Sequence, residues 1–139
     1  MGGINVGRWL AGGLLAGIVV WLVEGLASFV YANDMLATLE AHGLGMSEGA
    51  VAVALSLLVS LLCGLTLVFF YAAARPRFGP RPKTAILAAL ALWLGGYASL
   101  MGYVLLGLFT SRTLVLWGVV GLVDMTLGAL VGGWIYREA

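Results

Sequence analysis

Four long apolar segments alternate with short polar stretches along the chain. Two of the segments contain no charged side chain, and each of the other two is interrupted by one acid, Glu24 in the first and Asp124 in the last. A helix needs about 20 apolar residues to cross a bilayer, and none of the segments has the period of two that a membrane barrel requires. The pattern therefore predicts four transmembrane helices. Their spans are approximately residues 9–31, 49–74, 84–108 and 114–136.

The connections between the predicted spans contain helix-ending residues. The loop 75–83 holds all three prolines of the chain. Proline lacks a backbone donor and disfavours helix in the residue before it, so the second helix should stop there. Residues 109–113 form a short polar turn, which makes the last two spans an antiparallel hairpin. We therefore expect an all-α, up-down bundle of four helices in a single domain, residues 1–139.

The longest connection, residues 32–48, is predicted to contain a short helix of its own. Asn33 or Asp34 is suited to cap its start, and Gly43 to end it. Apolar residues recur on one face of this segment, which indicates a helix lying along the outer membrane surface. The residues of that face are Met35, Leu36 and Leu39.

The basic residues predict the orientation of the bundle. Only Arg112 falls on one side of the four-span arrangement, and the other basic residues fall on the opposite side, which the positive-inside rule assigns to the cytoplasm. Both termini and the loop 75–83 are then cytoplasmic, and Tyr31 and Trp117 lie in the outer aromatic belt. The basic residues of the cytoplasmic side are Arg8, Arg75, Arg77, Arg81, Lys83 and Arg137.

Composition and charge exclude several classes of protein. Apolar residues make up 63% of the chain and charged residues 9%, against roughly 25% charged in a soluble domain. A net charge of +1 offers no surface for nucleic acid. The single cysteine, Cys63, excludes an internal disulfide and a four-thiolate metal site, and the single histidine, His42, lies outside the spans. We therefore expect an integral membrane protein. We expect it to have no catalytic residue, metal or cofactor.

Several segments resemble a family of short four-helix bacterial inner-membrane proteins. The loop 75–85 is the most specific of them, and the resemblance covers nearly the whole chain. It implies the four-span topology and a bacterial cytoplasmic membrane, and it implies no activity. The other matching segments are Asn5–Arg8, Gly12–Gly17 with Glu24, Gly121–Asp124 and Gly133–Tyr136.

Glu24 and Asp124 are the only ionisable acids within the predicted spans. Each would cost roughly 2.5–3.5 kcal/mol if charged at the bilayer centre. The helical rise places Glu24 in the outer half and Asp124 near the middle, so they meet directly only if the helices tilt, and otherwise through hydroxyl groups or water. Hydroxyl groups at suitable depths belong to Ser28, Ser56, Ser60 and Tyr97.

Small-residue stripes run close to both acids. Such stripes let helix backbones approach one another, so we expect the two acids to face other helices rather than lipid. The stripes contain Gly13 and Gly17 in the first span, and Gly121, Gly128 and Gly132 in the last.

Two interpretations of the intramembrane polar residues stay open. They form a hydrogen-bonded network that locks the bundle or an oligomer, or Glu24, Asp124, Tyr97 and Ser60 form a proton- or cation-linked site. The basic loop has two compatible roles, a topology anchor and a binding site for anionic lipid headgroups. Its basic residues are Arg75, Arg77, Arg81 and Lys83.

The predicted function is non-enzymatic. We expect an accessory subunit of a membrane complex or a self-assembling bundle, because the glycine stripes exceed what one bundle needs. The alternative is a small proton-coupled transporter that uses Glu24 and Asp124. A membrane enzyme acting on lipid or quinone is supported only by the two buried acids. The expected partners are membrane lipid and either further copies of the chain or a larger membrane complex, and not nucleic acid.

Overall fold

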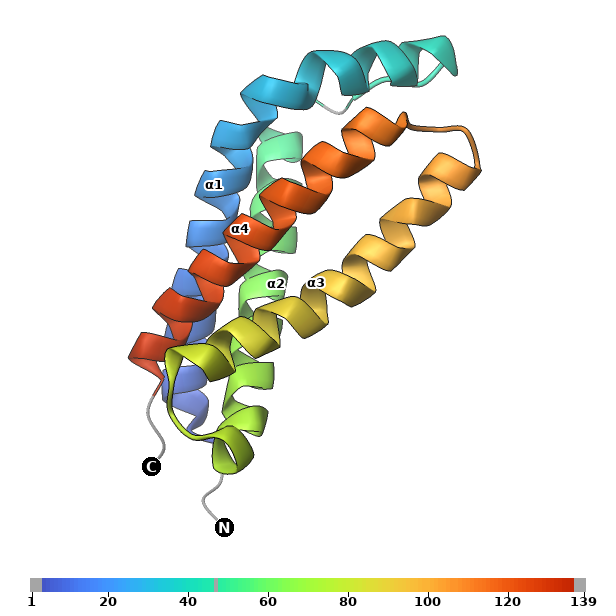
Figure 1. Ribbon diagram of the computed structural model, residues 1–139. Helices are drawn as coiled ribbons and strands as arrows, with labels where there is room; N and C mark the ends of the chain where they lie inside the picture. The colour runs from blue at the N-terminus through green and yellow to red at the C-terminus, as the bar shows by residue number, and fades with distance from the viewer. Residues whose placement is uncertain (1–3, 47, 137–139) are drawn as a thin grey trace.

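The protein is an all-helical bundle in the computed structural model, which describes residues 4–46 and 48–136. The described residues form four helices and no strand, and each helix is long and apolar enough to cross a membrane. The prediction of four apolar helices is confirmed. The helices are α1 (Val6–Ala41), α2 (Gly49–Phe78), α3 (Pro82–Leu105) and α4 (Ser111–Ile135), arranged as Figure 1 shows.

Helix α1 is longer than the sequence pattern predicts. It continues without a break to Ala41, and its last turns lie across the end of the bundle (Figure 1). The separate short helix capped by Asn33 or Asp34 was therefore a wrong prediction, because both residues lie inside α1. No glycine or proline occurs between residues 32 and 41, so extending the existing helix costs less than starting a new one.

Helix α1 ends next to Gly43, the residue that the sequence predicts as the end of the separate short helix. Gly43 has a φ of +68°, a conformation that favours glycine. Its N–H donates to Glu40 O at 3.0 Å, and the N–H of Leu44 donates to Leu39 O at 2.9 Å. These two bonds satisfy carbonyl groups that the helix end would otherwise leave free.

Helix α2 passes through the first proline of the basic loop and ends at Phe78. The expected stop after residue 74 is one turn too early. Pro76 lies in the last turn of α2, where its fixed φ suits a helix although its missing N–H leaves the carbonyl four residues earlier without that bond. The residue that ends the helix is Gly79, which follows Phe78 as the C-cap and has a φ of +80°. Helix α3 then begins with Pro82 in its first turn, where proline is favoured.

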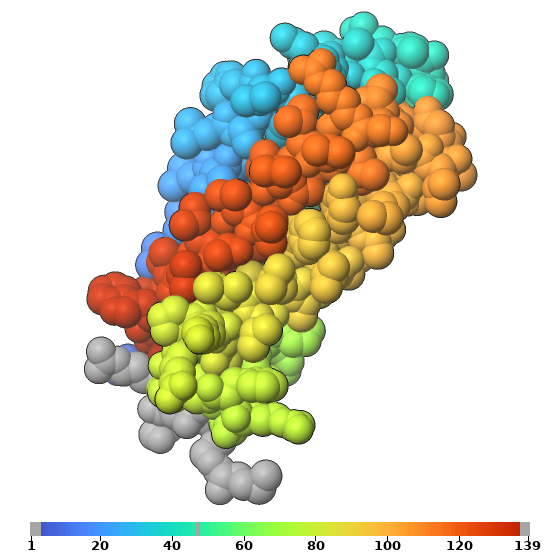
Figure 2. Space-filling model, viewed as in Figure 1, coloured from blue at the N-terminus to red at the C-terminus, as the bar shows by residue number. Residues whose placement is uncertain are grey.

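Helices α1, α2 and α4 form the core of the bundle. Helix α1 packs along both α2 and α4, whereas α3 packs on α4 and less extensively on α2. Figure 2 shows α3 and α4 side by side over one face of the molecule, with the last turns of α1 beyond them. The largest buried apolar side chains of this core are Leu67 and Val68 of α2.

Glycines make the closest helix contacts. A Cβ on Gly17 of α1 would lie 2.6 Å from Leu61 Cα of α2, and one on Gly13 would lie 2.8 Å from Leu65 Cα. Gly64 of α2 faces the same two α1 glycines, so backbone packs on backbone there.

The α1–α4 contact is built in the same way. A Cβ on Gly12 would lie 2.7 Å from Gly132 O, and one on Gly128 would lie 3.1 Å from Ala16 O. Gly121 faces α3 instead, where its Cβ would lie 3.6 Å from the Trp93 ring. The sequence pattern did not single out Gly12 and Gly64, although both contribute to these contacts.

Candidate functional site

The candidate site is a cluster of carboxyl groups between α1 and α4. Asp124 lies on α4 with only 4% of its surface exposed. One turn further along α4, Gly128 packs directly on the α1 backbone. The Asp124 side chain is therefore buried beside the contact between the two helices.

Glu24 reaches the same place from α1. Its Oε1 accepts a hydrogen bond from the hydroxyl group of Tyr31, which lies seven residues further along the same helix. Seven residues are about two helical turns, so both side chains project from one face. Tyr31 is 4% exposed, and its ring packs edge-on against Trp117 of α4, with centroids 6.2 Å apart.

The Glu24 and Asp124 carboxyl groups lie close enough to interact electrostatically, and no hydrogen bond between them is found among the described residues. Two ionised carboxylates close together in a buried site repel each other. One oxygen, Asp124 Oδ1, is buried and has no hydrogen-bond partner among the described residues. The cluster therefore holds two neighbouring carboxyl groups, one of which has an acceptor oxygen without a partner among the described residues.

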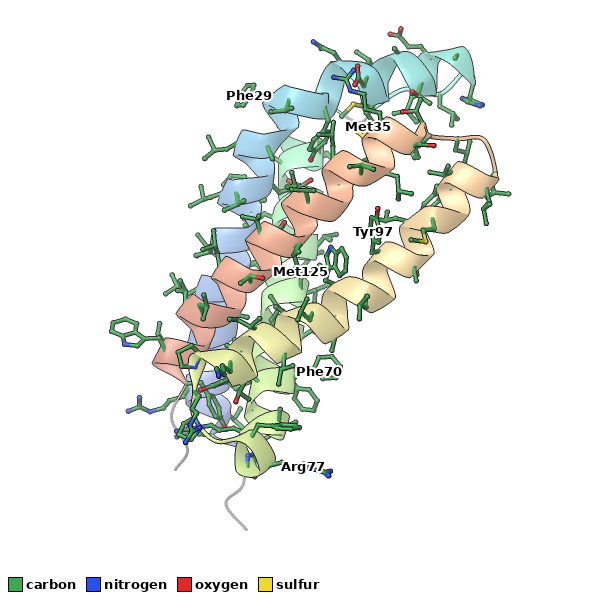
Figure 3. All side chains as sticks on the ribbon, viewed as in Figure 1. Phe29, Met35, Phe70, Arg77, Tyr97 and Met125 are labelled. Atoms are coloured by element: carbon green, nitrogen blue, oxygen red, sulfur yellow. The ribbon has the colours of Figure 1, made fainter. Side chains whose placement is uncertain are left out.

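Tyr97 lies apart from the carboxyl pair. It projects from α3 toward α4 (Figure 3) and stacks on Trp93, with ring centroids 5.0 Å apart and an interplanar angle of 9°. The stacked rings cover Gly118, whose carbonyl oxygen accepts a 2.8 Å hydrogen bond from Trp93 Nε1. No hydrogen bond from Tyr97 to either acid is found in the described part of the chain.

The three serines are also separate from the acids. Ser56 accepts a 3.0 Å hydrogen bond from Trp21 Nε1 and donates to Val53 O of its own helix, and Ser28 donates to Gly25 O at 2.7 Å. Ser60 is buried, and its backbone carbonyl lies against α1. Within residues 4–46 and 48–136, no hydrogen bond joins these hydroxyl groups to a carboxyl group. The structure brings together Glu24, Asp124 and Tyr31.

Tyr31 is the member of the site that the sequence analysis missed. Its position near the end of an apolar segment indicated the aromatic belt. The spacing of seven residues from Glu24 is the signal that was available, because it places the two side chains on the same helix face.

The basic residues gather at the end of the bundle opposite Gly43. Arg75 is half-buried in the last turn of α2, whereas Arg77, Arg81 and Lys83 are exposed. Arg8 Nη1 lies 3.5 Å from Ile135 O of α4, which places the start of α1 at this end too. Among the described residues, no group of three or more histidine, cysteine or acidic side chains is suited to hold a metal ion.

The fold and its four apolar helices define a multi-pass helical membrane protein. Comparison of the chain with protein-family models, with curated protein sequences and with solved structures gives no match.

Proposed function

We propose that the protein is a non-enzymatic protein of a bacterial cytoplasmic membrane, and that it acts as a subunit by assembling with other transmembrane helices. The partner helices belong to further copies of the chain or to a larger membrane complex. The observation that carries this proposal is a face of α3 made of small residues, in which both glycines border open space among the described residues.

The open face continues the packed face of α3. All buried residues of α3 belong to its first two turns, and Figure 1 shows the rest of the helix leaning away from α1 and α2. A Cβ on Gly95 or Gly102 would meet nothing within 4 Å. The open face is the set of small residues spaced four, three and four apart, namely Ala91, Gly95, Ala98 and Gly102.

Small residues in such a row normally allow a second helix to approach closely. The rows on α1 and α4 are used within the chain, where Gly17 and Gly132 each meet backbone atoms of a neighbouring helix. The row on α3 is also made of small residues, and a Cβ on either of its glycines would meet no atom of the described residues within 4 Å. A helix from another subunit packed there would bury it in the same way.

A structural role also suits the carboxyl cluster. Glu24 and Asp124 link α1 to α4 at a depth where an unpaired carboxylate is costly. The acids line neither the pocket at the ends of α2 and α4 nor the pocket beside Trp9. The cluster therefore resembles a polar lock between helices more than a substrate chamber.

The proposed orientation places both termini in the cytoplasm. Arg8, Arg75 and the basic loop share one end of the bundle, as the positive-inside rule requires of a cytoplasmic end. At the other end, Arg112 pairs with Asp34 at 3.0 Å. Arg137, which the sequence analysis assigned to the cytoplasmic side, lies outside the described residues.

Site-specific photo-cross-linking in the host membrane tests the assembly. A photo-reactive diazirine side chain at Ala98 should give a protein adduct of discrete mass, because this position lies on the open face. The same side chain at Val119, which is exposed on α4, is the matched control and should react with lipid. Equal labelling of lipid at both positions would contradict the proposal.

A second function, proton-coupled transport, is favoured by one observation. Asp124 Oδ1 is buried without a hydrogen-bond partner among the described residues and lies near a second carboxyl group, and intramembrane acids are common in proton relays. Proton flux into liposomes containing the purified protein, compared with Glu24→Gln and Asp124→Asn, separates the two functions. Flux that both variants abolish while they still assemble would favour transport, and unchanged flux with lost assembly would favour the structural role.

A further inference from the structure

A pocket of about 340 Å³ lies where α2 and α4 end and α3 begins. Its volume is within the ~300–1,000 Å³ range of small-molecule sites. Its walls combine basic, aromatic and apolar side chains, and they come from three helices and the loop between α2 and α3. The lining residues that matter here are Tyr71, Arg75, Arg81, Leu130, Trp134 and Tyr136.

Arg75 has unused hydrogen-bonding capacity in this pocket. Its Nη1 is buried and has no partner among the described residues. The guanidinium group lies over the Tyr136 ring, with Cζ 5.7 Å from the centroid, and Tyr71 packs edge-on against the same ring. The aromatic pair therefore holds the guanidinium group in position. A planar guanidinium group matches two oxygens of a phosphate group.

The rim of the pocket is held by its own hydrogen bonds. Thr84 is buried, and its hydroxyl group donates to Gly79 O at 2.8 Å. The positive φ of Gly79 turns the chain back, so that Arg81 borders the pocket. The first turn of α3 also borders it through Pro82 and Ala85. Its positive dipole end adds to the attraction for an anion.

Positive charge at this end is not neutralised by the described residues. Arg75 and Arg81 line the pocket, and the acids of the described chain are in the membrane cluster or at the opposite end. Glu138 is the one acid of the sequence that follows Asp124, and it lies outside the described residues. The experiment below therefore includes a variant of Glu138.

We propose that this pocket binds the phosphate group of an anionic phospholipid headgroup. A lipid is favoured over a free phosphate ion because one wall is apolar and open to the outside. Trp134, on that wall, is 78% exposed, and tryptophan and tyrosine side chains occur at the headgroup level of membranes. The inference rests on insertion in a membrane, and it is independent of the proposed assembly with other subunits.

Native mass spectrometry of the full-length protein tests the proposal. The protein is purified in micelles containing equal amounts of phosphatidylglycerol and phosphatidylcholine, and the retained lipids are counted. We expect wild type to retain phosphatidylglycerol preferentially. Arg75→Gln should reduce this retention about tenfold, as the loss of a charged hydrogen bond predicts.

Arg77→Gln is the matched control. It removes the same charge from the same helix turn, but Arg77 does not line the pocket and extends away from the bundle (Figure 3). Retention should stay within about twofold of wild type, because an exposed charge contributes only screened attraction. If Arg75→Gln lowers the stability of the fold, Arg81→Gln provides the same comparison from the other side of the pocket.

Three results would overturn the proposal. Equal losses in Arg75→Gln and Arg77→Gln would show diffuse attraction by the loop instead of a site. Displacement of the lipid by excess inorganic phosphate would identify a free anion as the occupant. Retention that appears only in Glu138→Gln would show that the chain's own carboxylate fills the pocket.

Discussion

Replacing Gly17 by alanine should destabilise the bundle through a single methyl group. Its Cβ would lie 2.6 Å from Leu61 Cα and 2.7 Å from Ser60 O, whereas carbon atoms in contact are normally about 3.5–4.0 Å apart. The α1 and α2 backbones must therefore separate by about 1 Å. Both clashing atoms belong to the backbone, so no side chain is free to move aside.

Overpacking of this kind costs about 1–3 kcal/mol. Gly25→Ala is the control on the same helix, because a Cβ at Gly25 meets nothing within 4 Å. Alanine is the better helix former by about 1 kcal/mol, so Gly25→Ala should be neutral or stabilising. The two variants make the same chemical change. Gly17→Ala should lower the free energy of unfolding, whereas Gly25→Ala should leave it unchanged or raise it.

Reversible unfolding in mixed micelles measures this difference. Sodium dodecyl sulfate is titrated into the detergent-solubilised protein, and the fluorescence of its five tryptophans reports unfolding. Equal stabilities of Gly17→Ala and Gly25→Ala would refute the close α1–α2 contact on which the packing account depends.

Three further substitutions test other contacts by the same titration. Tyr31→Phe removes the hydroxyl group that donates to Glu24 and should lower the free energy of unfolding by about 1–3 kcal/mol; wild-type stability would show that the bond contributes nothing. Gly79→Ala forces a methyl group into a conformation with a φ of +80°, at a cost of about 1–3 kcal/mol, and an unchanged midpoint would contradict that turn. Arg112→Ala should change stability by less than about 1 kcal/mol, since its pair with Asp34 is solvent-exposed; a larger loss would show that this ion pair matters more than its exposure indicates.

The four helices could be predicted because long apolar segments separated by charged residues are typical of membrane-spanning helices. Their ends were less certain, because single residues decide them. Gly43, predicted to end a separate short helix, ends the extended α1 instead, since glycine readily adopts a positive φ. Asn33 and Asp34 are residues that often serve as the N-cap of a helix. An N-cap is used only where a new helix begins, and here α1 continues through both residues. Pro76 resembled a stop, but its fixed φ suits a helix, and α2 continues through it to Phe78 despite the lost backbone bond.

The acids of the candidate site were evident from the sequence, and their contacts were not. Depth along straight helices placed Glu24 and Asp124 at different levels. Their approach depends on how α1 crosses α4, which Gly12 and Gly128 determine through close backbone contacts. A depth estimate along single helices contains no information about that crossing.

Assembly through the open face of α3 is tested most directly by native mass spectrometry of the protein extracted from its own membrane in mild detergent. The account predicts a stoichiometric complex, with further copies or with another subunit. Gly95→Leu should dissociate it, because the added side chain occupies the open face. Gly25→Leu, at a glycine of α1 that is equally free of contacts, should leave it intact. A wild-type protein found only as a single chain, or a Gly95→Leu complex as stable as that of wild type, would contradict the account.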